Sequence, residues 1–274
     1  MDLNVLSLGA GVQSTTILLM SHEGYLPKLD AAIFADTGWE PQDIYSHLDE
    51  LEKTVSIPIH RVSYGNIRED VLRALNKGGV GNIGQPPFYV RNASNDGTAN
   101  EDEGGKLWRK CTADYKVGPI QKKVRELLGY KKREVIKKKA RQWIGISIDE
   151  AHRMKDSRQS WIDNWYPLVD KMMSRDDCLR WLKAHGYKVP RKSSCIGCPY
   201  HSKGYWVRMK KYLPDEWKDA VEFDNELRKG KLPGVTGDAF LHRRMLPLEQ
   251  AVALDHDEDQ MDFFGNECEG MCGV

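Results

Sequence analysis

The first 37 residues constrain the fold most strongly, because an apolar run, a small-residue loop and a second apolar run follow one another there. Val5–Leu8 predicts a short buried strand, and Ile17–Met20 predicts a helix. The residues between them, Gly9 to Thr16, include two glycines and three hydroxyl side chains. Glycine lets a phosphate approach the backbone closely, and the free N–H groups at a helix start attract it. This order of elements therefore predicts an anion site.

A second strand is expected at Ala31–Ala35, with Asp36-Thr37-Gly38 at its carboxyl end. Open α/β sheets bind ligands outside the carboxyl ends of their strands, so we expect both loops to face one crevice. The first loop lacks the Lys-Ser/Thr pair of the ATPase P-loop, and GAGVQS does not fit the GxGxxG fingerprint. The alternative is an ordinary strand-to-helix turn in a doubly wound fold.

Composition describes a globular chain without a strong overall charge. The chain has 274 residues, of which 40% are hydrophobic and 30% charged, with a formal charge of +1. No apolar run approaches the length of about 18 residues that a membrane span needs, and we expect a cytoplasmic protein. Six cysteines in such a chain favour metal or redox chemistry over disulfides.

Periodicity predicts the remaining elements. We expect helices over 41–55, 68–75, 174–185 and 205–229, and one that ends at Leu128. Further strands are expected at 57–62, 143–148 and 165–168. The stretch Gly78–Gly105 has little periodicity and is interpreted either as an active-site loop or as an insertion without regular structure. Cys178 shares a helix face with Trp181 and Leu182, which is typical of a core thiol.

Positive charge concentrates in Lys131–Arg141, where seven basic residues accompany one acid, Glu134. Such a run is suited to contact the phosphates of a nucleic acid or nucleotide. A solvated helix face or a connector is the alternative. His242-Arg243-Arg244 is a second, weaker anion candidate.

Cys195 and Cys198 form a CxxC knuckle followed by proline. The spacing allows both sulfurs to reach one ion, but by itself it fits zinc, an iron–sulfur cluster or a redox dithiol. Two further thiols are needed for a four-cysteine site.

The pair SLGAGVQST and FADTGWE resembles the PP-loop (adenine nucleotide alpha hydrolase-like) superfamily, and within it the 3′-phosphoadenylylsulfate (PAPS) reductase family. CTADYKVGPI, GISIDE and the tail cysteines extend the resemblance, which covers most of the chain outside Gly78–Gly105 and part of Gly230–Asp259. It implies a five-stranded, mostly parallel Rossmann-like α/β sheet with helices on both faces and a C-terminal Cys-rich helical appendage. We expect a nucleotide-binding domain at 1–170 and the Cys-rich region at 171–274.

The resemblance also implies an adenine nucleotide site with ATP and Mg²⁺. Asp36 is the candidate for holding the metal or orienting the nucleotide, and Arg153 and Arg158 are candidates for phosphate or sulfate. Ser147 or Ile148 stands where relatives often carry an arginine, which weakens the match to a sulfonucleotide enzyme. The candidate nucleotide-binding residues are Ser7, Gly9, Gly11, Gln13, Ser14, Thr15, Asp36, Thr37, Gly145 and Ile146.

For the cysteines, the resemblance implies a [4Fe–4S] cluster on Cys111, Cys195, Cys198 and Cys268, with zinc as the alternative. Relatives with a cluster carry a Cys-Cys pair where this chain has Cys111-Thr112, so the fourth ligand is expected from the tail. Cys272 is then the candidate nucleophile or sulfur carrier. The two tail cysteines are interchangeable in these roles, since neither matches the family's tail motif fully.

Three functions follow from this reasoning. The first is ATP-dependent sulfur transfer to a nucleic acid (tRNA or DNA) or a small molecule. The second is a thioredoxin-coupled PAPS or APS reductase that releases sulfite, and the third is a non-catalytic nucleotide-binding protein. A sulfur or electron donor protein and a second copy of the chain are the other expected partners, with no membrane partner.

Overall fold

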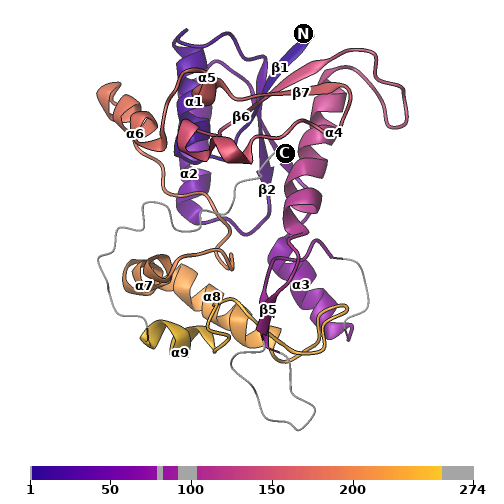
Figure 1. Ribbon diagram of the computed structural model, residues 1–274, viewed down its shortest axis with the longest axis vertical. Coiled ribbons are helices and arrows are strands. Elements are labelled where there is room, and N and C mark those ends of the chain that lie inside the picture. Colours follow the sequence, from indigo (N-terminus) through magenta and orange to yellow (C-terminus); the bar gives the residue numbers. More distant parts are fainter. Residues whose placement is uncertain (1, 79–82, 92–103, 255–274) are drawn as a thin grey trace. The chain divides into compact units, whose positions relative to one another are not determined.

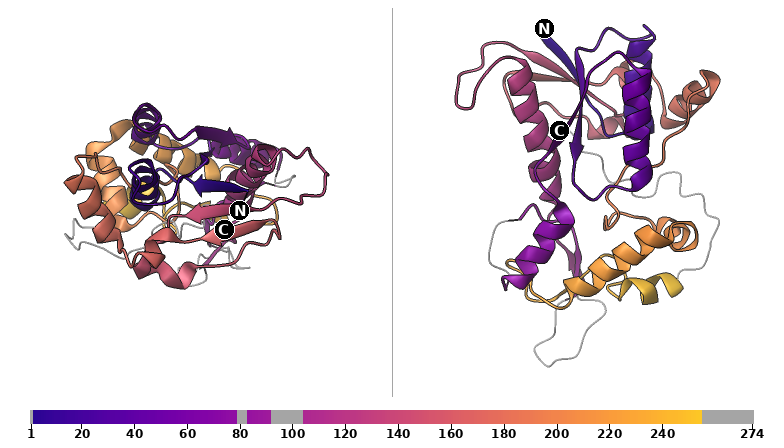
Figure 2. Two further views of the ribbon diagram at one scale, coloured as in Figure 1. Left: turned by 90° about the horizontal axis from the view of Figure 1, so that it is seen from above. Right: turned by 180° about the vertical axis from the view of Figure 1, so that it is seen from behind.

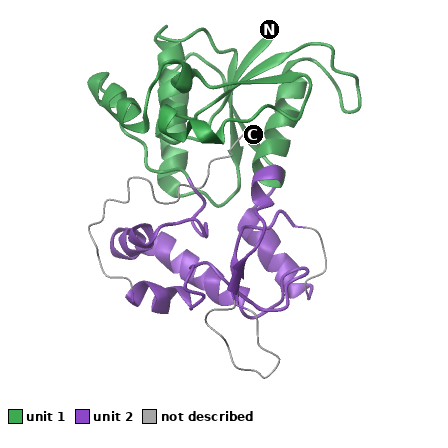
Figure 3. Cartoon of the chain, in the orientation of Figure 1, with its two compact units in different colours: residues 1–64, 114–193, 271–274 green, residues 65–113, 194–270 purple. Residues whose placement is uncertain are grey.

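The computed structural model describes residues 2–78, 83–91 and 104–254. The described chain forms two compact units (Figure 3). Unit 1 contains 2–64 and 114–193, and unit 2 contains 65–113 and 194–254. The expected Cys268 and Cys272 lie outside the described residues.

Unit 1 is built on the expected five-stranded sheet, and every pair of neighbouring strands in it is parallel. The spatial order is β3-β2-β1-β6-β7. The strands are β1 (Leu3–Ser7), β2 (Ala31–Asp36), β3 (Ile59–Ser63), β6 (Ala140–Ile144) and β7 (Ile162–Trp165). The predicted α/β class is confirmed.

Alternate side chains of the central strands enter two different cores, because successive residues of a strand point to opposite faces. Leu6 and Phe34 pack with α1 (Val12–His22), α2 (Gln42–Thr54) and α6 (Arg175–Ala184). Val5 and Ile33 pack with α4 (Gly118–Leu127). Figures 1 and 2 show α1 and α2 on one side of the sheet and α4 on the other. Both faces are thus covered, which explains why these strands read as continuous apolar runs.

The strand order creates a switch point between β1 and β6. From β1 the chain moves outward through β2 to β3, and it then returns to place β6 on the opposite flank of β1. Leu3 pairs with Ala140 and Ser7 with Ile144, so the two strands end at the same level. In open parallel sheets the loops that leave such strands diverge, so a ligand crevice is expected at the carboxyl edge of this sheet.

Two strands are displaced by three or more residues from their expected positions, whereas β1 and β3 are shifted by one or two. The strand expected at 143–148 lies at Ala140–Ile144, and the chain leaves the sheet at Gly145. The strand expected at 165–168 lies at Ile162–Trp165, and Pro167 begins the short helix α5 (Pro167–Asp170). Proline has no N–H for a strand ladder and suits the first turn of a helix, which accounts for the second shift.

Helix α6 confirms the interpretation of Cys178 as a core thiol. Ser174 caps the helix in a capping box with Asp177, which fixes where the helix begins. Cys178 and Leu182 then point into the core beside α1 and are fully buried. Burial raises the pKa of the Cys178 thiol to about 12, so it stays protonated.

Unit 2 holds a three-stranded antiparallel sheet in the order β5-β4-β8. Its strands are β4 (Tyr89–Arg91), β5 (Gly104–Lys106) and β8 (Asp238–Phe240), and its helices are α3 (Ile67–Asn76), α7 (Lys203–Tyr212), α8 (Pro214–Leu227) and α9 (Leu248–Ala253). The stretch Gly78–Gly105 therefore contributes a strand that the sequence did not predict. The single helix expected over 205–229 is divided at Pro214, again because proline starts a helix but cannot continue one.

Asp224 ties unit 2 together. Its buried carboxylate accepts hydrogen bonds from the backbone N–H groups of Leu241 and Leu248, both at 2.9 Å, and pairs with Arg228 at 2.6 Å. These contacts join α8 to the chain that follows β8.

The two units differ from the expected division at residue 170. Unit 2 takes in 65–113, which is inserted between β3 and α4, and α6 belongs to unit 1 because it covers the face of α1. The amino-acid composition does not change where the chain passes from one unit to the other, so the sequence did not predict these boundaries. None of the helices in the described part of the chain is long and apolar enough to cross a membrane.

Candidate functional site

The loop after β1 presents a helix start without a side-chain cap. Gly11 is the N-cap of α1 and has no side chain to satisfy the first N–H groups of the helix, and Thr15 N is bonded to Gly11 O at 3.0 Å. The N–H groups of residues 12–14 therefore have no acceptor within the helix. Ala10, rather than either glycine, adopts the left-handed conformation in this loop (φ 57°).

The end of β6 packs directly on this helix start. A Cβ added at Gly145 would lie 3.0 Å from Ser14 N and 3.2 Å from Ser14 Cα. At Gly9 and Gly11 the nearest contacts would be ordinary, at 3.8 and 3.7 Å. Gly145 is thus the glycine that close packing requires, and it brings the two loops of the switch point together.

Side chains after β6 divide between the core and the crevice. Ile146 is buried with Ile144 and Tyr166, so only its backbone is available to a ligand. Ser147 is fully buried, and its hydroxyl has no hydrogen-bond partner among the described residues. An orphaned buried hydroxyl at this edge is suited to a ligand that the structure does not contain.

Asp36 is fixed at the carboxyl end of β2. Its Oδ1 accepts hydrogen bonds from Gly38 N at 2.7 Å and from the Tyr45 hydroxyl at 2.8 Å. Burial and this bond to Asp36 raise the pKa of Tyr45 far above its usual value, so Tyr45 stays a donor. No hydrogen bond to the other carboxylate oxygen is found within the described residues.

Thr37 and Glu40 form a buried polar group beside Asp36. The Thr37 hydroxyl donates to Glu40 Oε1 at 2.9 Å, and Lys116 Nζ lies 3.9 Å from the same oxygen. Glu40 is almost completely buried and Lys116 nearly so. Thr37 therefore supports Glu40 through its hydroxyl, and Lys116 brings a positive charge from the CTADYK segment to this carboxylate.

The hydroxyl of Thr15 is directed to α2 and not to the loop. It lies 3.0 Å from Nε2 of His47, which is buried on the same helix face as Ile44, Leu48 and Leu51. Nδ1 of His47 has no partner among the described residues. Burial lowers the pKa of His47, and the ring is neutral in this setting.

Glu150 connects the two loops electrostatically. Gln13 Nε2 donates to Glu150 Oε2 at 3.1 Å, and Arg153 is paired with the other oxygen of the same carboxylate. All three lie at the carboxyl edge, where the short 3₁₀ helix Ile148–Arg153 follows β6. Arg158 is exposed and adjoins Gln159, which lines a pocket at the other edge of the sheet.

The cysteine knuckle belongs to unit 2. Cys198 N donates to Cys195 O at 3.1 Å, and the ring Nε2 of His201 lies 3.0 Å from the carbonyl oxygens of both Cys195 and Ile196. His201 stacks on Tyr205 with a centroid distance of 3.8 Å, which holds the ring in place. The turn is thus fixed by its backbone, and both thiols are half-buried and form no disulfide within the described residues.

Cys111, also half-buried and in no disulfide within the described residues, lies in the same unit, where its N–H donates to Gln85 O at 3.2 Å. Among the described residues, no three His, Cys, Asp or Glu side chains are grouped closely enough to hold a metal ion. The knuckle alone fits one half of a four-thiolate site. The complete set with Cys268, and the role of Cys272, stay predictions.

The second anion candidate, His242-Arg243-Arg244, contains one buried and two exposed side chains. His242 is buried and its Nδ1 accepts from Arg244 N at 3.2 Å, whereas Arg243 and Arg244 are exposed. His242 is therefore part of the fold of unit 2.

Sequence reasoning missed the residues that support the crevice from neighbouring elements. These are Glu40, Tyr45, His47, Lys116 and Ser193, the last lying against Gly11. Of these residues, only His47 had a signal in the sequence, because it is a polar residue in the apolar stripe of α2.

Comparisons with known proteins find a likeness among solved structures. No family model matches the chain, and no curated protein matches it. Among solved structures, the chain is similar to the phosphoadenylyl-sulfate (PAPS) reductase from Candida auris, a phosphate complex, with 14% sequence identity and a TM-score of 0.38. The likeness covers 69% of this chain and 74% of that one. A likeness of this size carries no argument about the reaction.

Replacing Gly145 with alanine should destabilise unit 1. The new Cβ would press on the backbone of Ser14, which cannot move away as a flexible side chain would. We expect a loss of about 1–3 kcal/mol in the free energy of unfolding, the usual effect of overpacking. Chemical denaturation measures it. Gly9→Ala is the matched control and should have little effect, and equal losses in both variants would contradict the close contact.

His47 should make stability depend on pH. Because its folded-state pKa lies below the unfolded value of about 6.5, its contribution is complete above that pH and is lost as the pH falls through it. The free energy of unfolding should therefore fall from about pH 7 to about pH 5. In His47→Gln the free energy of unfolding should fall less steeply with decreasing pH. In His22→Gln, where the replaced side chain is exposed, it should follow the wild type. Parallel curves for all three proteins would contradict the prediction. The pKa of His60 is also lowered by burial, but His60 is present in all three.

Proposed function

We propose that this chain is a PAPS-reductase-like PP-loop enzyme of sulfur metabolism that binds ATP in the crevice and activates an acceptor for sulfur transfer. One observation carries the proposal. At the switch point of a parallel sheet, an uncapped helix start is held against the end of β6 by the close contact at Gly145. Such a site is suited to the phosphates of a nucleotide.

The described residues supply specific roles for nucleotide binding. The N–H groups of residues 12–14 and the Ser14 hydroxyl would hold the terminal phosphates, and the orphaned hydroxyl of Ser147 is a further donor. Asp36, oriented by Gly38 and Tyr45, would hold Mg²⁺, which prefers oxygen ligands and supplies charge neutralisation at the phosphates. Most of the rate would come from this positioning.

The charge balance of the crevice favours Mg²⁺-ATP over a sulfonucleotide. Asp36, Glu40 and Glu150 contribute three carboxylates, against Lys116 and Arg153. The charge of Arg153 is already paired with Glu150, and a bare anion would meet an excess of negative charge. A divalent cation removes this excess.

The reductase remains the second candidate, because Cys195 and Cys198 are half-buried, form no disulfide within the described residues and could serve thiol chemistry. It requires APS or PAPS in the same crevice, so the nucleotide that binds distinguishes the two reactions.

Asp36→Asn should remove the Mg²⁺-dependent part of ATP binding. We expect the wild type to be stabilised thermally by ATP with Mg²⁺ and to release pyrophosphate when the acceptor is present, and the variant to bind ATP at least about tenfold more weakly. Asp43→Asn is the control, since Asp43 is exposed on α2 and changes the charge equally. Stabilisation by APS or PAPS in place of ATP would favour the reductase, and no stabilisation by any of the three would exclude the nucleotide site.

We propose that Cys195 and Cys198 provide half of a metal site whose other ligands are Cys111 and Cys268, holding a [4Fe–4S] cluster or, in the alternative, zinc. Protein purified without oxygen should contain iron and sulfide in equal amounts, or zinc alone. Cys195→Ala/Cys198→Ala should lose the metal, whereas Cys178→Ala, at a thiol buried in the core of unit 1, should retain it. Elemental analysis and the visible spectrum measure the content. Metal-free wild-type protein would overturn the site.

A further inference from the structure

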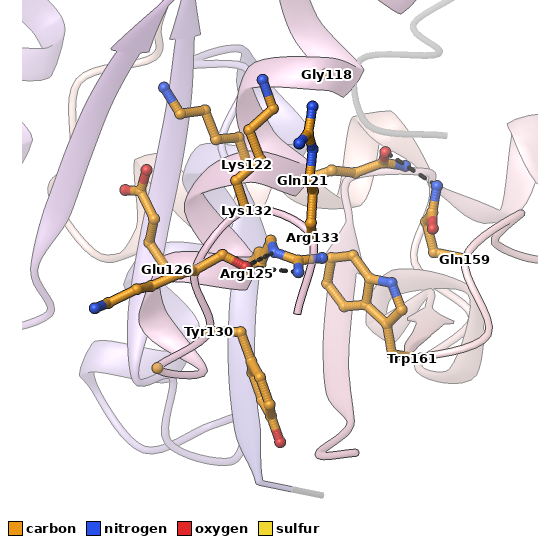
Figure 4. Close-up of a pocket in the computed structure, with 12 residues that line it drawn as sticks. Gly118, Gln121, Lys122, Arg125, Glu126, Tyr130, Lys132, Arg133, Gln159 and Trp161 are labelled. Carbon is orange, nitrogen blue, oxygen red and sulfur yellow. Dashed lines mark hydrogen bonds between the residues drawn. The ribbon is translucent and has the colours of Figure 1, made fainter. Parts of the chain in front are cut away.

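A pocket of about 880 Å³ opens on unit 1 away from the crevice (Figure 4). One side of α4 along its length, the turn that follows it and the residues before β7 surround the pocket. Its lining is Gly118, Gln121, Lys122, Arg125, Glu126, Gly129, Tyr130, Lys131, Lys132, Arg133, Gln159 and Trp161. We call it the basic pocket.

Five cationic side chains line the basic pocket, against the single carboxylate of Glu126. Glu126 lies 3.6 Å from Lys123, which is outside the lining. Within the described residues, Lys122, Lys132 and Arg133 form no ion pair. Their charges are not neutralised by a carboxylate and are therefore available to an anionic ligand.

The turn that carries these charges is fixed before any ligand arrives. Arg125 donates to the carbonyl oxygen of Lys131, at 2.8 and 2.7 Å, and to that of Glu134. Lys131 N donates to the Glu134 carboxylate at 2.6 Å, which uses the only acid of the basic run. The Tyr130 hydroxyl accepts from the backbone N–H groups of Lys137 and Lys138 at 3.2 and 3.3 Å. A preformed turn loses less entropy on binding.

Arg133 occupies a conformation that favours glycine. Its φ is 73°, in the left-handed region that is unfavourable for a residue with a side chain. A glycine or asparagine would relieve this cost, but neither would bring a charge to the pocket. Strain at a residue that lines a pocket is consistent with a role in binding.

The basic pocket lies at the opposite edge of the sheet from the crevice. Its turn leads into the amino end of β6 at Ala140, whereas the loop after β1 leaves from the carboxyl edge. A five-residue strand separates the two edges by about 16 Å. The cations of the turn therefore lie away from the loops that carry the candidate nucleotide site, although the lining reaches Gly118 at the start of α4.

We propose that the basic pocket binds the phosphodiester backbone of a single-stranded nucleic acid. Cations that come from α4 and from the turn suit phosphates repeated along a strand, and the half-buried rings of Tyr130 and Trp161 give bases an apolar wall. The pocket thereby limits which basic residues are expected to bind the nucleic acid. Lys137–Lys139 belong to the basic run but do not line the pocket, whereas Lys122 from α4 lines it. That this nucleic acid is also the sulfur acceptor rests on the proposed function, but its binding does not.

The test is the binding of a fluorescent single-stranded oligonucleotide of about 15 residues, RNA and DNA in separate arms, followed by anisotropy over a range of salt. Lys132→Ala/Arg133→Gly should weaken binding at least about tenfold and lower the slope of log affinity against log salt by about 2. Arg133→Gly relieves the backbone, so its stability should be equal to or above that of the wild type. Weaker binding without lost stability separates binding from a structural role.

Lys137→Ala/Lys138→Ala is the matched control, because it removes the same charge from the same turn but outside the pocket. It should leave affinity within about threefold of the wild type. Equal losses of affinity in both variants would show that only net charge matters, and would overturn the proposal that the pocket binds the nucleic acid. Wild-type protein that binds neither oligonucleotide, or that binds an acidic peptide equally well, would also overturn the proposal. Thermal stabilisation by ATP, measured in parallel, tests the crevice independently.

Discussion

The contact between Gly145 and the backbone of Ser14 is the constraint on which the candidate site depends. It sets the end of β6 against the start of α1 with no room for a Cβ, so both loops of the switch point share one crevice. The parallel pairing of β1 with β6 brings the two strand ends to the same level, and the cores on both faces of the sheet hold them there. A small shift of either element would separate the helix start from Ser147 and Glu150.

Electrostatic balance gives the crevice its chemical character. Carboxylates outnumber cations there, while the basic pocket at the other edge has the reverse balance. The formal charge of the whole chain is +1, so the net charge gives no sign of these two regions of opposite charge. One fold can therefore present a metal-dependent anion site and a cationic surface about one strand length apart without a strong overall charge.

The sequence was sufficient for features that short stretches determine. The order of strand, loop and helix in the first 22 residues, the strand expected at 31–35 and the buried stripe of α2 were predicted, because hydrophobic period and turn residues are local signals. The start of α1 was not, since it begins at Val12, within the expected loop. His47, Tyr45 and Glu40 could not be predicted as partners of Thr15, Asp36 and Thr37, since these pairs exist only once α2 packs beside the sheet. The basic run was found, but the pocket also required Gln159 and Trp161, which lie in the turn before β7.

The insertion of 65–113 between β3 and α4 has a consequence for how the protein folds. Central strand β1 is complete after seven residues, yet its neighbour β6 follows much later, and the bond from Lys139 N to Asp2 spans 137 positions. Contacts of such long range are slow to form because the chain must first close a large loop. During synthesis, β1 therefore has one open, apolar edge until β6 arrives, and such edges pair readily with other chains. The insertion thus sets the interval in which the nascent protein is most exposed to aggregation.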